Sequence, residues 1–203
     1  MSQHIDYYAS LNSPWTHLGA ARLLDIADKH GATVRIHPVD FMTVFAGSGG
    51  VPLPKRSPQR QAYRLQELER WRKHLNIPIH LRPKFFPANE TSAAHCVLAV
   101  RETIGDRPAI ALAHRVLKAL WEEEADTGDR ETLKRLIGEV GLDPSAIIGQ
   151  ADDERWAGLR LAETKAALER GVFGAPSYVV GDDIFWGQDR LDFLDRRLGT
   201  PSA

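Results

Sequence analysis

Two short segments of the chain combine residue types that suit the binding of an anion such as a thiolate. Ser13-Pro14-Trp15-Thr16 opens the first predicted helix, where Ser is a favoured N-cap and Pro suits the first helical position. A helix N-terminus offers unpaired N–H groups and a partial positive charge of about half a unit, which stabilise an anion placed there. The Ser13 hydroxyl can add one hydrogen bond to that anion, or Ser13 and Pro14 only cap the helix.

The second segment is Gly171–Ser177, with the sequence Gly-Val-Phe-Gly-Ala-Pro-Ser, and it stands just before a predicted hairpin. Its Pro176 is either a proline at the edge of a strand or part of a binding site. Gln188 and Asp189 follow the hairpin and open the last predicted helix. An acidic residue there is favoured by the helix dipole alone, or it pairs with a cationic group of a ligand.

Composition excludes several other chemistries. Cys96 is the only cysteine, which rules out an intramolecular disulfide, a Cys-x-x-Cys motif and a multi-cysteine zinc site, and we expect no metal. A net charge of −1 shows no basic bias of the kind that nucleic-acid binders carry. Residues 1–6 lack the parts of a secretory signal, and no apolar run approaches the roughly 18 residues of a membrane helix. We therefore expect a cytoplasmic protein with neither nucleic acid nor membrane as a partner.

The elements that must position these segments differ along the chain. The first 40 residues read β-α-β, with a strand at 5–8, a helix that Gly31 ends, and an alternating strand at 33–39. The end reads β-β-α, with strands at 177–180 and 184–186 and a helix before Gly199 and Pro201. Apolar periodicity predicts helices between the two ends at about 57–75, 90–104, 110–121, 133–140 and 154–170, with loops at 46–54 and 83–87.

This order predicts an α/β fold in which both ends of the chain join one mixed sheet. We expect a discontinuous domain of residues 1–45 and 171–203, and an all-helical insertion at 55–165. Charge is uneven within the insertion, because residues 55–84 carry nine Lys or Arg and two Glu. This basic stretch is either a solvated helix face or a surface beside the active site that attracts anions.

The ordered motifs resemble the thioredoxin plan, and the helical insertion resembles its DsbA-like branch. Disulfide oxidoreductases of that branch carry Cys-Pro-x-Cys at the first helix, whereas Ser13 and Thr16 stand at the two cysteine positions here. The resulting Ser-Pro-aromatic sequence at this helix start resembles that of kappa-class glutathione transferases and of bacterial 2-hydroxychromene-2-carboxylate isomerases. The isomerases agree over more of the chain, at four segments: the Ser13 helix start, Lys55–Trp71, Pro83–Asn89, and the pair Gly171–Ser177 with Phe185–Leu191.

The resemblance implies a thioredoxin-like fold that binds glutathione as its cofactor. It implies that Ser13 holds the glutathione sulfur and that the Ala175–Pro176 bond is cis, with the Ala175 backbone facing the ligand. Gln188 and Asp189 then bind the γ-glutamyl end. The relatives place Asn-x-Pro-Pro in the loop after the second strand, and this chain has no Asn there. Lys55 or Arg56 can replace that contact, and we favour Lys55.

The same resemblance implies an enzyme that interconverts 2-hydroxychromene-2-carboxylate and trans-o-hydroxybenzylidenepyruvate, by thiolate addition, bond rotation and elimination. We expect a small aromatic carboxylate as substrate and allow for a homodimer. Trp15, Phe85 and Phe86, with Asn89 beside them, line the substrate pocket, or the aromatic residues belong to the core. The alternatives are a kappa-like transferase or peroxidase that acts on other electrophiles, and a thioredoxin-like binding module without catalysis.

Two further residues carry weaker signals. His17 lies one turn after Ser13, so its side chain either lies on the same helix face as Ser13 or is a surface histidine. We favour the surface histidine. Cys96 has no motif partner, and we expect a small buried residue there.

Overall fold

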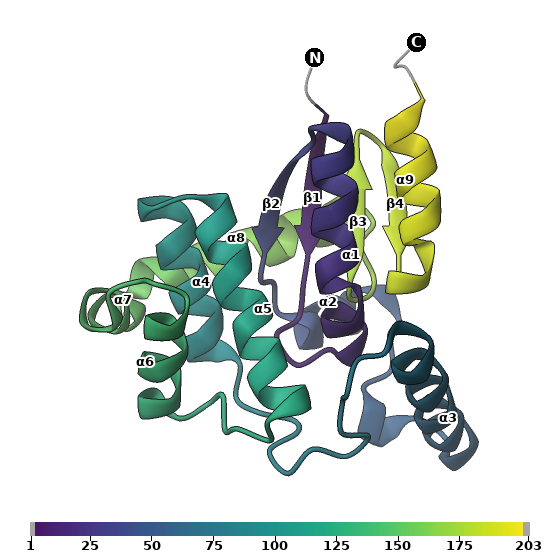
Figure 1. The fold of residues 1–203 in the computed structure, drawn as a ribbon, viewed down its shortest axis with the longest axis horizontal. Helices are drawn as coiled ribbons and strands as arrows, with labels where there is room; N and C mark the ends of the chain where they lie inside the picture. Colours follow the sequence, from purple (N-terminus) through teal and green to yellow (C-terminus); the bar gives the residue numbers. More distant parts are fainter. Residues whose placement is uncertain (1–2, 201–203) are drawn as a thin grey trace.

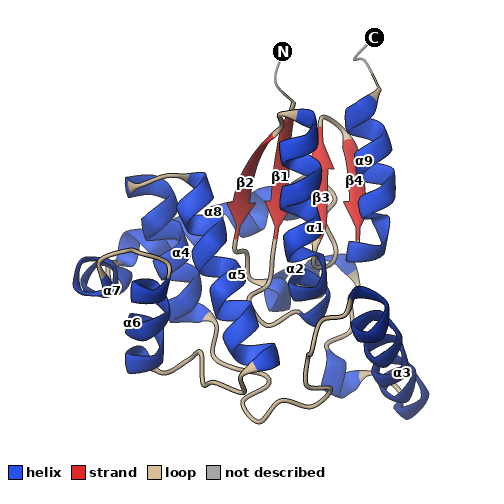
Figure 2. Ribbon diagram, in the orientation of Figure 1, coloured by secondary structure: helices blue, strands red, loops and turns tan. Residues whose placement is uncertain are grey.

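The computed structural model describes residues 3–200, and its sheet is built from the two ends of the chain. The strands are β1 (His4–Tyr8), β2 (Thr33–His37), β3 (Ser177–Val180) and β4 (Asp183–Trp186). Their spatial order is β2-β1-β3-β4, with β1 parallel to β2 and the other pairs antiparallel (Figure 2). The prediction of one mixed, thioredoxin-like sheet is therefore confirmed. Pro201, expected to follow the last helix, lies outside the described residues.

Helices make up most of the remaining described chain. They are α1 (Pro14–His30), α2 (Phe41–Ser48), α3 (Pro58–Leu75), α4 (Thr91–Thr103), α5 (Asp106–Glu122), α6 (Arg130–Glu139), α7 (Pro144–Ala151), α8 (Glu154–Glu169) and α9 (Leu191–Gly199), with short 3-10 turns η1 (Leu53–Lys55) and η2 (Gln188–Arg190). The predicted helices are found close to their expected bounds. α2 and α7 were not predicted, and residues 46–48 of the expected loop form the end of α2.

The sheet lies between two layers of helices (Figure 1). Ile5 and Tyr7 of β1 pack in one apolar cluster with residues of α1, α4, α5 and α9. Tyr8 of the same strand packs on the opposite face, in a cluster with residues of α2 and α8. The change of face from Tyr7 to Tyr8 follows from the two-residue period of a strand.

The helices between β2 and β3 lie in different places. Figure 1 shows α4, α5, α6 and α7 together beside β2, whereas α3 lies at the other side of the molecule, below α9. The apolar cluster that contains β1 also contains Val97 of α4 and Ile137 of α6, so the sheet and these helices share one core. The division into a sheet domain and an insertion domain remains a prediction.

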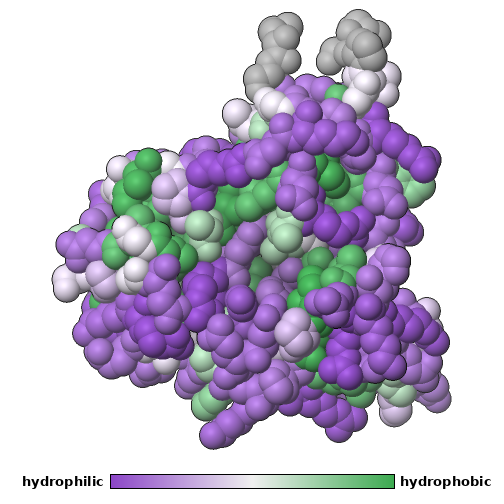
Figure 3. Space-filling view, viewed as in Figure 1, coloured by the Kyte–Doolittle hydropathy of each residue, from purple (hydrophilic) through white to green (hydrophobic). Residues whose placement is uncertain are grey.

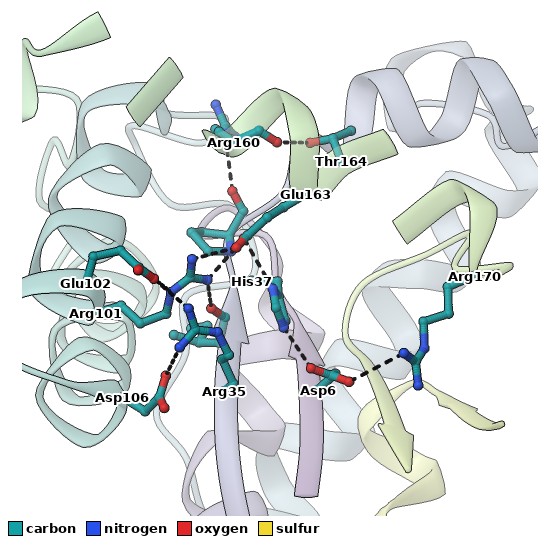
Figure 4. Close-up of polar contacts among 12 residues, drawn as sticks. Asp6, Arg35, His37, Arg101, Glu102, Asp106, Arg160, Glu163, Thr164 and Arg170 are labelled. Carbon is teal, nitrogen blue, oxygen red and sulfur yellow. Dashed lines mark hydrogen bonds and ion pairs between the residues drawn. The ribbon is translucent and has the colours of Figure 1, made fainter. Parts of the chain in front are cut away.

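A cluster of charged side chains joins the sheet to α4 and α8 (Figure 4). Nε2 of His37 lies 2.9 Å from Asp6 Oδ1, and its Nδ1 lies 3.2 Å from Glu163 Oε2. Arg101, whose side chain is fully buried, pairs with Glu163 and donates to the Ile36 carbonyl. The cluster thus fixes the end of β2 against the two helices.

Candidate active site

The N-terminus of α1 is built as the sequence predicts. Ser13 is the N-cap, and its Oγ accepts a hydrogen bond from the Thr16 amide at 3.2 Å, while Pro14 takes the first helical position. Among the described residues, the Ser13 hydroxyl donates to no acceptor and the Trp15 amide has no partner. Two hydrogen-bond donors at the positive end of α1 are therefore free for a ligand.

The segment before β3 presents unpaired backbone. The Ala175–Pro176 peptide bond is cis, which confirms the prediction, and the Pro176 carbonyl accepts from the Gly187 amide at 2.8 Å. Ala175 lies outside the ladder of β3, and within residues 3–200 neither its N–H nor its C=O has a hydrogen-bond partner. Such a segment can pair with the extended backbone of a peptide-like ligand.

A pocket of about 640 Å³ brings the two segments together, and its volume lies in the range of small-molecule sites, about 300–1,000 Å³. Of the predicted residues, Trp15, Ala175, Gln188 and Asp189 line it. Ser13 and Pro176 do not line the pocket themselves. Pro176 directly follows Ala175, and Ser13 lies two residues before Trp15. The other lining residues are Arg56, Gln59, Arg60, Tyr63, Arg64, Glu67, Trp71, Trp186, Gly187 and Arg190.

The turn η2 holds Gln188 and Asp189 at the pocket wall. Gly187, with a φ of 99°, allows the chain to enter this turn, and a Cβ there would clash with the Asp189 carboxylate. Gln188 is buried, and its Oε1 accepts from Arg22 at 3.1 Å, while its Nε2 has no partner in the described chain. Asp189 pairs with Arg190 at 3.0 Å. A buried amide donor and a carboxylate thus stand side by side at the wall.

The opposite wall comes from α3 and is basic. Arg56, just before the helix, and Arg60 and Arg64 within it follow one another at four-residue spacing, and all three line the pocket. Figure 3 shows a mostly hydrophilic surface over α3, while an apolar strip crosses the face over α1. The placement fits the second interpretation of the basic stretch, a surface beside the site. Four-residue spacing of arginines was the sequence signal that could have identified these three residues.

Other predicted site residues lie elsewhere. Lys55, in η1, is exposed and does not line the pocket, whereas Arg56 does. Phe85, Phe86 and Asn89 line a second, shallower pocket of about 520 Å³. Phe86 is connected to the first pocket through Arg64, whose guanidinium lies over the Phe86 ring. The Asn89 side chain accepts a hydrogen bond from the Thr91 amide, at the start of α4.

The loop before Ser13 is fixed by the segment that precedes α4. Asn12 exchanges two hydrogen bonds with the backbone of Ala88, at 2.8 and 3.0 Å. The Glu90 carboxylate accepts from the Ser10 hydroxyl and the Asn12 amide. Its other oxygen accepts from Arg160 of α8 at 2.9 Å. The start of α1 is therefore held from two sides, by α8 and by the 83–90 loop.

The two remaining candidate residues, His17 and Cys96, are both buried. His17 is buried and lies 2.8 Å from Glu122 Oε1, so the prediction of a surface histidine is wrong. Cys96 is buried, as expected, and burial raises the pKa of its thiol to about 12, which leaves the thiol unreactive. Among residues 3–200 no group of His, Cys, Asp and Glu is arranged to hold a metal ion. Within the same range, no helix is both long and apolar enough to cross a membrane.

Comparison with known proteins places the whole described chain in one family. Residues 4–199 match the DSBA-like thioredoxin domain. A 2-hydroxychromene-2-carboxylate isomerase from Sphingobium xenophagum is 32% identical over 98% of this chain and 99% of its own length. A glutathione S-transferase kappa 1 from Caenorhabditis elegans is 23% identical over 97% of this chain and 91% of its own. A solved structure of a 2-hydroxychromene-2-carboxylate isomerase superposes with a TM-score of 0.79, at 29% identity over 97% of this chain and 94% of that one. The chain therefore belongs to the DSBA-like thioredoxin domain family and, within it, to the enzyme family of the 2-hydroxychromene-2-carboxylate isomerases.

Proposed function

We propose that this protein is a glutathione-dependent isomerase that interconverts 2-hydroxychromene-2-carboxylate and trans-o-hydroxybenzylidenepyruvate. The observation that carries the proposal is the free Ser13 hydroxyl at the N-terminus of α1, beside a pocket that Ala175, with its unpaired backbone, also lines. The relatives named for this isomerisation support the substrate, and the kappa-class relative supports the cofactor. A cytoplasmic location and a homodimer belong to the same proposal.

The residues present fit glutathione as a ligand. The unpaired N–H and C=O of Ala175 suit the peptide backbone of the tripeptide. The unpaired Gln188 amide suits the γ-glutamyl carboxylate, and Asp189 suits the α-ammonium group beside it. Arg56 lines the pocket and suits a second carboxylate, a role for which Lys55 is the nearby alternative. The charged groups of the ligand and part of its peptide backbone thus have partners of complementary charge or hydrogen-bonding type.

The chain's own contribution to the chemistry is electrostatic. When bound, glutathione would supply the nucleophilic thiolate for reversible addition to the conjugated double bond, a chemistry with no net oxidation. A cysteine-type thiol has an ordinary pKa of about 8.5, so it needs stabilisation as the anion at neutral pH. The α1 N-terminus and the Ser13 hydroxyl both stabilise negative charge, which lowers that pKa. A serine cannot form a mixed disulfide, so Ser13 holds sulfur without being oxidised.

The direct test is the isomerisation itself, followed by the ultraviolet spectra of the two acids. With glutathione, the protein should bring either isomer to the same equilibrium mixture. Without glutathione, or with S-methylglutathione in its place, the rate should fall to the uncatalysed value, because the nucleophile is missing or blocked. Wild-type protein that leaves both acids unchanged in the presence of glutathione contradicts the proposal.

A kappa-like transferase is the second candidate, favoured by the similarity to glutathione S-transferase kappa 1 along almost the whole chain. The two functions share the α1 N-terminus and differ in the electrophile. Conjugation of glutathione to 1-chloro-2,4-dinitrobenzene, without isomerisation of the chromene acid, would identify the transferase.

A further inference from the structure

Arg64 is a partly buried cation without a counter-ion. Its guanidinium lies 5.4 Å from the centre of the Phe86 ring and 5.8 Å from that of Trp121. Among the described residues, its side chain makes no ion pair and no hydrogen bond. Burial, with repulsion from Arg56, lowers the pKa of Arg64 to about 10, so it still carries its charge at neutral pH.

The two carboxylates among the residues that line the pocket have partners of their own. Glu67 pairs with Arg70, and Asp189 pairs with Arg190. The positive charge of Arg64 is therefore not neutralised locally. Like charges four residues apart on a helix repel each other and destabilise it, and Arg60 stands four residues before Arg64. An arrangement that costs stability in the free protein is expected where an anion binds.

The surroundings of Arg64 indicate what kind of anion this is. The pocket that Arg64 lines also presents the aromatic rings of Trp15, Tyr63 and Trp71. Trp15 is two residues from Ser13, so aromatic surface lies next to the start of α1. The attraction between the guanidinium and the two rings behind it holds the cation in place. Its planar N–H donors match a carboxylate, which they can bind through two parallel hydrogen bonds.

We propose that Arg64 binds the carboxylate of the aromatic acid substrate and makes the pocket selective for acids over neutral aromatic compounds. This inference rests on the isomerase function proposed above. The other two arginines suit the role less well. Arg56 already donates to the Val51 carbonyl at 2.7 Å, and Arg60 is exposed, where water and salt screen its charge. Arg64 is the more buried, so its interaction with an anion is the stronger.

The experiment measures binding by calorimetry with two probes of the same shape, trans-2-hydroxycinnamate and its neutral amide. The wild type should bind the acid more tightly than the amide. Arg64→Gln should weaken binding of the acid by about tenfold to a hundredfold, the range for a hydrogen bond to a charged group, and leave the amide unchanged. Arg64→Lys keeps the charge without the planar donors and should fall between. Lys73→Gln, the same charge change at an exposed position of α3 outside the pocket, should match the wild type.

Several outcomes overturn the inference. The inference is wrong if the wild type prefers the amide, binds both probes equally or binds neither. This result is measured on the wild type, so it does not depend on whether a variant folds. Another such outcome is an Arg64→Gln protein that binds the acid as tightly as the wild type, or that loses acid and amide to the same extent. Turnover separates this inference from the proposed function. A wild type that does not isomerise the chromene acid refutes the function, whereas an active wild type whose KM is unchanged in Arg64→Gln refutes only the role of Arg64.

Discussion

The Ser13 hydroxyl has two roles that substitution can separate. As an acceptor it caps α1 through the Thr16 amide, and as a donor it has no partner in the described chain. The first role contributes to stability and the second to the proposed chemistry. Glycine is tolerated at an N-cap almost as well as serine, whereas alanine is not. Comparison of the two variants therefore distinguishes a cap from a thiolate ligand.

Ser13→Gly should reduce the isomerisation rate by about tenfold to a hundredfold, because a hydrogen bond to a charged sulfur contributes about 1.5–3 kcal/mol. The free energy of unfolding should fall by only a few tenths of a kcal/mol, against about 1 kcal/mol for Ser13→Ala. The bound thiol should titrate at higher pH in both variants, which thiolate absorbance measures. Wild-type turnover by Ser13→Gly would show that the residue is only a cap.

At this scale the sequence predicted the parts of the site that depend on local motifs. The cap at Ser13 and the segments around Ala175 and Gln188 are read from neighbouring residues, and the structure brings Trp15, Ala175, Gln188 and Asp189 to one pocket. Arg64 was not predicted, because its role depends on which side of α3 faces the pocket. That orientation is set by tertiary packing, which the four-residue spacing alone does not determine.

At the scale of elements, the position of α1 depends on contacts with distant segments. Glu90 accepts hydrogen bonds from Ser10 and Asn12 with one oxygen and from Arg160 with the other. Burial raises the pKa of Glu90, although Arg160, Ser10 and Asn12 oppose the shift. The carboxylate is thus costly to bury, and its partners keep the loop before Ser13 in place.

Glu90→Ala should lower the free energy of unfolding by about 1–3 kcal/mol, because it leaves the Ser10 hydroxyl and one N–H group of Arg160 without their acceptor. The isomerisation rate should fall as well, since the loop that leads into α1 loses an anchor. Chemical denaturation and kinetics measure the two effects. Glu131→Ala is the control, an exposed glutamate that pairs with Lys134 on the surface of α6, and it should change stability by less than about 0.5 kcal/mol. Equal effects of the two substitutions would show that Glu90 is not an anchor.

The two helices that the sequence did not predict were missed for different physical reasons. α2 ends in Gly47 and Ser48, residue types that indicate a loop. In the structure Gly47 packs closely against α8, since a Cβ there would lie 3.0 Å from the Leu168 side chain. α7 has eight residues, too few for its periodicity to stand out. The long helices and the β-α-β and β-β-α ends were predicted, because each carries its own repeating apolar pattern.

At the scale of the whole molecule, stability depends on the charged cluster that joins the sheet to α4 and α8 (Figure 4). Burial alone would lower the pKa of His37, but the carboxylates of Asp6 and Glu163 outweigh it and raise the pKa above 6.5. The hydrogen bond with His37 lowers the pKa of Asp6. Burial opposes the lowering of the Glu163 pKa, which His37 and Arg101 nevertheless bring about. Each partner thus stabilises the charged form of the other.

These directions define a pH window for the contribution of the cluster. His37 binds its proton more tightly in the folded state, so its contribution is complete below the unfolded pKa of about 6.5 and is lost as pH rises through the folded value. The carboxylates bind protons less tightly in the folded state, so their contribution is present above about 4.5 and is lost as pH falls through their folded values. The cluster should stabilise the fold most between these limits, near pH 5–6.

His37→Gln should therefore lower the free energy of unfolding most near pH 6, and the difference from the wild type should shrink as pH rises to 8.5. Urea denaturation at half-unit steps of pH measures it. The series stops at pH 8.5 because the Cys96 thiol, buried with its pKa raised to about 12, ionises more readily once the chain unfolds and would add its own slope above that pH. His80→Gln is the matched control, since His80 is exposed and has no carboxylate partner in the described chain, and its curve should follow the wild type. A stability difference for His37→Gln that stays constant from pH 6 to 8.5 would mean that the charge of His37 does not hold β2 to the helices.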